Sequence, residues 1–152
     1  MECIITVNKL IQLLFILISL CIQPVFASEQ DNNAVLISAS GKLIPEFTNK
    51  EIRLLYLGFP VTKEEQTYEP LINASDPVTY KQFLQKVMFM TENRYQRQLI
   101  SRVFRNGGEQ PIRFDDKDNL INSLKNKTNT ITFVMAGTAS QLDNVQVIQR
   151  LW

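Results

Sequence analysis

The residues best suited to bind an anion lie in the stretch Asn73-Ala74-Ser75-Asp76-Pro77, between a strand pattern and an amphipathic helix pattern. The first turn of a helix carries unpaired N–H groups and about half a unit of positive charge, so an oxyanion binds well there. Asp76 offers a second interpretation, because its carboxylate, just before Pro77, accepts from the same N–H groups and repels an anion. We favour a helix capped by Asp76 over an anion site. A protonated phosphate oxygen would still let Asp76 act as a ligand acceptor.

Other polar side chains are candidates for the same site. Ser38 and Ser40 follow an apolar strand pattern, where open α/β sheets bind ligands, but turn formation explains them as well. Arg94, Arg97 and Arg105 share one side of a helix pattern, which is either an anion or partner surface or an ordinary solvated face. The candidate ligands for an oxyanion are Ser38, Ser75, Asp76, Thr79 and Arg105.

Several kinds of chemistry are excluded by residue type. The chain contains no histidine, and its two cysteines are Cys3 and Cys21. If the N-terminal segment that holds them is removed, a zinc site, a cysteine nucleophile and a Ser-His-Asp triad are all impossible. Asp115, Asp116 and Asp118 suit the first turn of a helix better than a calcium loop, which needs more oxygen ligands and a central glycine. We therefore predict a protein that is not an enzyme and needs no metal or cofactor.

The N-terminal segment has the layout of a secretory signal peptide. An apolar run covers residues 10–22, and small residues precede a cleavage position between Ala27 and Ser28. The run is shorter than the roughly 20 residues of a membrane span, although an uncleaved anchor is the alternative. We expect residues 1–27 to be the signal peptide and residues 28–152 to form a periplasmic protein without a membrane span. The formal net charge of +1 gives no general attraction to nucleic acid.

Strand and helix patterns alternate along the rest of the chain. Strands are predicted at residues 34–38, 68–73, 111–114, 130–137 and 145–151. Four helices are predicted: one at residues 49–57, a second that begins at Pro77, a third that ends at about Arg105, and a fourth from Asp115 or Asp116 through Leu124. In the third helix we expect a buried face made of Tyr95, Leu99, Ile100, Val103 and Phe104. The interleaving predicts one α/β domain with a mostly parallel or mixed sheet of four or five strands and helices on both faces. Residues 131–134 should lie at the centre of the sheet, with residues 145–148 beside them.

The order of these elements carries a family resemblance. The helix in "FTNKEIRLLYLG" ends in Tyr56-Leu57-Gly58, and a later helix ends in Phe104, followed by Gly107, Gly108 and Pro111. Over about residues 34–150 the chain resembles the short stand-alone periplasmic proteins related to the substrate-binding component of phosphate ABC transporters. The resemblance implies a type II periplasmic-binding-protein fold, of which this chain has the length of little more than one lobe. It also implies a small oxyanion such as phosphate as the ligand.

The sequence departs from this family at three places. Leu99 stands where the family has a tryptophan, residues 129–132 replace a glycine-rich approach to a strand, and Ser75-Asp76-Pro77 replaces a Ser-Gly-Thr type loop. Two functions are therefore expected. The chain is either a non-enzymatic binding module for an oxyanion, or an interaction or sensor-accessory domain that has lost the oxyanion site and contacts a membrane or periplasmic protein. A single lobe leaves an anion in contact with water, so we expect weak phosphate binding.

Overall fold

The computed structural model describes residues 32–41 and 43–152 of the 152-residue chain. The predicted signal peptide, including the cleavage position between Ala27 and Ser28, lies outside the described residues. Within the described ranges, no helix is both long enough and apolar enough to cross a membrane.

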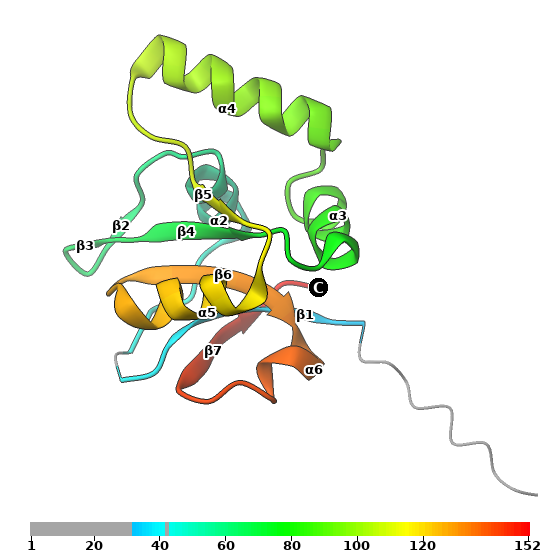
Figure 1. The fold of residues 1–152 in the computed structure, drawn as a ribbon. Coiled ribbons are helices and arrows are strands. Elements are labelled where there is room, and N and C mark those ends of the chain that lie inside the picture. The colour runs from blue at the N-terminus through cyan, green and yellow to red at the C-terminus, as the bar shows by residue number, and fades with distance from the viewer. Residues whose placement is uncertain (1–31, 42) are drawn as a thin grey trace, which may run out of the picture.

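Five strands form one mixed sheet in the order β5-β4-β6-β1-β7 (Figure 1). β4 pairs in parallel with β5 and β6, whereas β1 pairs antiparallel with β6 and β7. The predicted α/β class is therefore confirmed, with a mixed sheet of five strands and residues 131–134 in its central strand. The strands are β1 (Ala34–Ala39), β4 (Glu69–Asn73), β5 (Ile112–Phe114), β6 (Thr130–Met135) and β7 (Val145–Arg150).

The expectation that residues 145–148 lie beside the central strand is wrong, because β1 separates β7 from β6. Residues 34–38 are buried on both faces of β1, while β7 has no fully buried residue and Val147 is 56% exposed. A strand that is apolar on both faces needs a neighbour on each side, so β1 takes the inner position and β7 the edge.

Five helices and a short hairpin complete the described part of the domain. The helices are α2 (Asn49–Tyr56), α3 (Pro77–Lys86), α4 (Glu92–Asn106), α5 (Lys117–Asn126) and α6 (Ala136–Ala139), and the hairpin pairs β2 (Thr62–Lys63) with β3 (Gln66–Thr67). Thr48 and Glu51 form the capping box at the start of α2, and Asp116 caps α5. The sequence patterns did not predict the hairpin or α6, and they extended the central strand by two residues.

The hydrophobic core lies on both faces of the sheet. On one face, Leu36, Ile72 and Phe133 pack against α2, α3 and α4, and the ring of Phe83 stacks on that of Phe133 with centroids 3.9 Å apart. On the other face, Val35, Ile37, Leu71 and Val134 pack against α5 and α6. Because alternate residues of a strand point to opposite faces, Leu36 belongs to one core and its neighbours to the other. The prediction of helices on both faces is confirmed.

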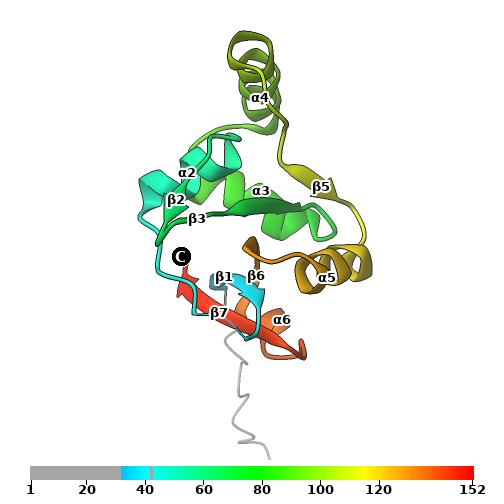
Figure 2. The ribbon, with the colours of Figure 1, turned by 90° about the vertical axis from the view of Figure 1, so that its left-hand side faces the viewer.

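Helix α4 projects from the domain as an arm (Figures 1 and 2). Tyr95 and Leu99 are buried, but Ile100 is 47% exposed and Phe104 is 86% exposed. The prediction that Ile100 and Phe104 complete a buried face is therefore wrong, and Val103 is only half-buried. Tyr95 and Phe104 are nine positions apart in the sequence, which places them on opposite sides of a helix with 3.6 residues per turn. A helix that contacts the domain along one side buries only one of them.

Candidate functional site

The junction between β4 and α3 closes on itself through Asp76. Oδ1 of Asp76 accepts from the backbone N–H of Val78 at 3.0 Å and from that of Thr79 at 3.2 Å. Oδ2 of Asp76 accepts from the hydroxyl group of Thr79 at 2.5 Å. Both carboxylate oxygens therefore bind the first turn of α3, and the capping interpretation is confirmed.

The other polar residues of this junction are also bound internally. The backbone N–H and the hydroxyl group of Ser75 both donate to Oδ1 of Asn73, at 3.2 and 2.7 Å. Asn73 is 4% exposed, and its Nδ2 donates to the carbonyl of Phe133 at 3.0 Å. This network fixes the end of β4 against β6, and it uses the hydroxyl proton that Ser75 would offer to a ligand.

Two of the predicted ligands lie away from this junction. β1 is antiparallel to β6 and β4 is parallel to it, so the carboxyl ends of β1 and β4 lie at opposite edges of the sheet. Ser38 is 1% exposed at the end of β1, where its hydroxyl group accepts from Nε2 of Gln146 at 3.0 Å. Arg105 lies in the last turn of α4, where it lines a separate small pocket together with Leu57 and Phe59. Of the five candidates, the structure brings together Ser75, Asp76 and Thr79, and it separates Ser38 and Arg105 from them.

A small cavity of about 240 Å³ opens beside Ser75 and Asp76, and we call it the switch-point cavity. From β4 the chain passes through α3 and α4 to β5, which lies on one side of β4 in the sheet. It then returns through α5 to β6, which lies on the other side of β4. Open α/β sheets bind ligands at the point where the connections reverse in this way. Lys117 contributes a cation to the lining and Asp76 a carboxylate. The cavity is lined by Asn73, Ser75, Asp76, Lys117, Leu120, Ile121, Val134, Met135 and Thr138.

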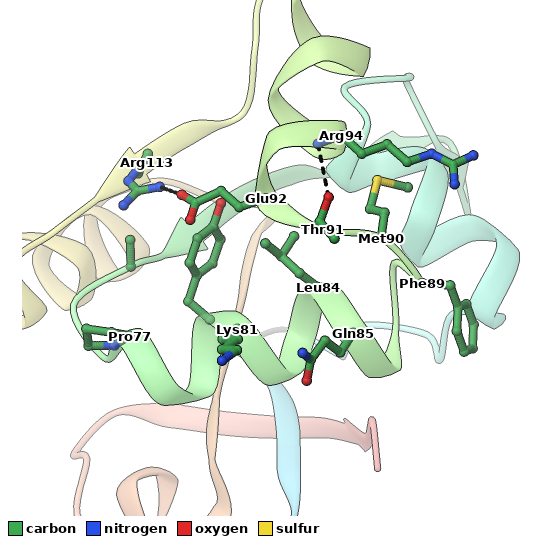
Figure 3. Close-up of a pocket in the computed structure, with 12 residues that line it drawn as sticks. Pro77, Lys81, Leu84, Gln85, Phe89, Met90, Thr91, Glu92, Arg94 and Arg113 are labelled. Carbon is green, nitrogen blue, oxygen red and sulfur yellow. Dashed lines mark hydrogen bonds and ion pairs between the residues drawn. The ribbon is translucent and has the colours of Figure 1, made fainter.

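A larger groove of about 750 Å³ lies between α3, the start of α4 and β5, and we call it the α3–α4 groove (Figure 3). Its lining combines apolar side chains with four charged ones. Figure 3 shows that Leu84 and Met90 lie between the two helices and that Arg113 and Glu92 close one end. The lining residues are Ala74, Pro77, Tyr80, Lys81, Leu84, Gln85, Phe89, Met90, Thr91, Glu92, Arg94 and Arg113.

Arg113 organises the closed end of the α3–α4 groove. Its Nη1 contacts Oε1 of Glu92 at 3.1 Å, and its Nε donates to Oδ1 of Asp115 at 3.0 Å. The guanidinium carbon also lies 4.9 Å from the centroid of the Tyr80 ring, a cation–π contact. Burial opposes the charge of Arg113, but the hydrogen bonds to Asp115 and Glu92 raise its pKa. Burial and the negative charge of Glu92 raise the pKa of Tyr80.

Comparison with known proteins returned no matching family model, no matching curated protein and no matching solved structure. The resemblance to phosphate-transporter binding proteins thus stays a prediction from sequence motifs. In the described part of the chain, no group of three or more His, Cys, Asp or Glu side chains lies where it could hold a metal ion.

Sequence reasoning missed the α3–α4 groove. Tyr80 and Leu84 fit a core-facing stripe, and both are indeed buried, so their periodicity gave no sign of a neighbouring hollow. Arg113 comes from another segment and reaches Tyr80 only through the pairing of β5 with β4. A groove formed by separate segments leaves no short motif to detect.

Proposed function

We propose that this chain is an exported, non-enzymatic accessory module related to the binding proteins of phosphate ABC transporters, and that Asp76 closes its oxyanion site. Support for a type II periplasmic-binding-protein lobe comes from the motif order, the α/β class and the parallel β5-β4-β6 unit with its switch point. The observation that carries the proposal is that both oxygens of the Asp76 carboxylate bind the first turn of α3.

A closed junction opposes phosphate for two reasons. The N–H groups of Val78 and Thr79 already donate to Asp76, so a ligand must compete with an attached carboxylate for them. The negative charge of Asp76 also repels an anion placed at the same helix end. With the Ser75 hydroxyl group bound to Asn73, few donors at this junction are free for an oxyanion.

Isothermal titration of the purified protein with phosphate and sulfate tests this function. We expect no binding in the micromolar range for either anion, and micromolar phosphate binding by the monomer would overturn the proposal. The same titration of the Lys117→Gln variant is a second measurement, because this variant lacks the cation that lines the switch-point cavity but keeps Asp76. Any weak phosphate signal that disappears in Lys117→Gln would locate residual anion binding in that cavity.

A second candidate function, contact with an acidic protein partner, is favoured by the exposed side of α4. Ile100 and Phe104 are exposed one turn apart, and Arg97 and Arg105 are exposed on the same helix. A few aromatic and arginine side chains suffice as the energetic centre of a protein interface. Two apolar residues make a smaller face than an amphipathic helix needs for binding a membrane.

Photo-crosslinking in cells tests this second candidate. A photoactivatable residue in place of Phe104 should yield a discrete adduct, and the same residue in place of the exposed Asp118 on α5 provides the control. An adduct from position 104 that Arg97→Glu abolishes supports contact with an acidic partner. Equal labelling from both positions, or labelling of lipid alone, contradicts it.

A further inference from the structure

We propose that the α3–α4 groove binds a small organic anion with an apolar body, of the aromatic or branched monocarboxylate class. The groove lies next to the β4–α3 junction, but Asp76 and Ser75 do not line it. The inference therefore stands independently of whether the oxyanion site is closed.

The size and the apolar lining of the α3–α4 groove suit a small organic molecule. Small-molecule sites usually measure about 300–1,000 Å³, and this groove has about 750 Å³. The half-buried Met90 and the exposed Phe89 provide accessible apolar surface above the buried Leu84 (Figure 3). A bare phosphate would leave most of that surface in contact with water, whereas an aromatic or branched body would cover it.

Phe89 forms part of the groove in an uncommon backbone conformation. Its φ angle is +54°, in the left-handed region that bulky residues rarely adopt, and its side chain is 65% exposed. The guanidinium carbon of Arg53 lies 5.2 Å from the centroid of its ring. Strained residues often mark binding sites, and here the strain holds an aromatic ring at the edge of an apolar groove.

The hydroxyl group of Tyr80 is a buried hydrogen-bonding group in the lining without a well-aligned partner. Tyr80 is 5% exposed, and its buried hydroxyl oxygen has no partner within hydrogen-bond geometry, although the side chains of Gln96 and Arg113 lie close enough to lower its pKa slightly. Buried polar groups normally have a partner, so this position is prepared for a polar atom of a ligand. Because burial and Glu92 raise the pKa of Tyr80, the hydroxyl group keeps its proton and can donate it.

The charges around the α3–α4 groove favour an anion. Glu92 is paired with Arg113, whereas Lys81 and Arg94 form no ion pair with any residue that the structure describes. Figure 3 places Lys81 on α3 and Arg94 at the start of α4. The two unpaired cations make the potential around the groove more positive and so favour a carboxylate, while the apolar body of the same ligand contacts Met90 and Phe89.

Titration with 3-phenylpropionate, with its neutral amide and with inorganic phosphate tests this inference by calorimetry and by NMR. We expect the carboxylate to bind and to shift the signals of Leu84 and Met90. The amide should bind about tenfold more weakly, the equivalent of about 1.4 kcal/mol for one lost charge interaction. Absence of carboxylate binding at millimolar concentration, or equal binding of acid and amide, overturns the proposal.

Matched variants locate the interaction. Lys81→Gln with Arg94→Gln should weaken carboxylate binding about tenfold. Lys125→Gln with Arg97→Gln should leave it unchanged, because Lys125 and Arg97 are exposed and do not line the groove. All four positions are on the surface, so both double variants should fold, which thermal melts will verify. Equal affinity of the two double variants would place the binding elsewhere and refute the assignment.

Discussion

Thr79 binds the carboxylate of Asp76 twice, through its hydroxyl group to Oδ2 at 2.5 Å and through its backbone N–H to Oδ1 at 3.2 Å. The side chain of Asp76 is thus held by the helix that it caps. This pair determines how both stability and anion binding respond to a change at position 76.

We predict that Asp76→Ala lowers the free energy of unfolding by about 0.5–2 kcal/mol, whereas Asp76→Ser and Asp76→Asn lower it little. Alanine removes the acceptor for the N–H groups of Val78 and Thr79, and serine or asparagine retains one. Urea denaturation measures the difference. Asp118 lies in the first turn of α5 but does not cap it, so Asp118→Ala is the control. An Asp76→Ala protein as stable as the wild type would contradict the capping role.

The same serine variant should improve oxyanion binding. Asp76→Ser keeps a cap but removes the negative charge at the helix end, so phosphate should raise its melting temperature more than that of the wild type. Asp116→Ser makes the equivalent change at the cap of α5 and serves as the matched control. A phosphate-dependent rise seen only in the wild type would mean that Asp76 is a ligand acceptor.

Substitutions along α4 should distinguish its two sides. Leu99→Ala removes a side chain that is 2% exposed and should cost about 2–5 kcal/mol. Phe104→Ser changes a side chain that is 86% exposed and should alter stability by less than about 0.5 kcal/mol. Thermal and urea unfolding provide the comparison. A large loss of stability in Phe104→Ser would show that α4 packs on the domain along its whole length.

Stability should fall at acidic pH partly through Glu51. The backbone N–H of Thr48 donates to Oε2 of Glu51 at 2.7 Å, and this bond lowers the pKa of Glu51 below its ordinary value of 4.5. A carboxylate with a lowered pKa in the folded state contributes stability above its unfolded pKa and loses it as pH falls through the folded value. Glu51→Gln should therefore flatten the stability profile below about pH 4.5. An unchanged acid profile in Glu51→Gln would exclude this contribution.

Export should produce a mature protein that begins at Ser28. Signal peptidase cleaves after small residues such as Ala27, so N-terminal sequencing of protein from a periplasmic extract should start with Ser-Glu-Gln. Ala27→Phe should block processing. Recovery of a protein that starts at Met1 in the membrane fraction would favour the uncleaved anchor.

The sequence by itself determined the local features of this protein. Asp76 was identified as a cap, and the start of α5 was placed at Asp115 or Asp116, because a capping side chain binds N–H groups two or three residues further along the chain. The central position of residues 131–134 was also predictable, since a strand that is apolar on both faces must be covered on both. These features depend on neighbours in the sequence or on average polarity.

Tertiary structure decided which distant residues meet. The antiparallel direction of β1 sends Ser38 to the opposite edge of the sheet from Ser75, although both follow apolar strands. Helix α4 contacts the domain along one side, and this leaves Phe104 exposed. Arg113 reaches Tyr80 at the end of the α3–α4 groove because β5 pairs with β4. Strand direction and helix contact are set by packing of the whole chain, and no short segment of sequence encodes them.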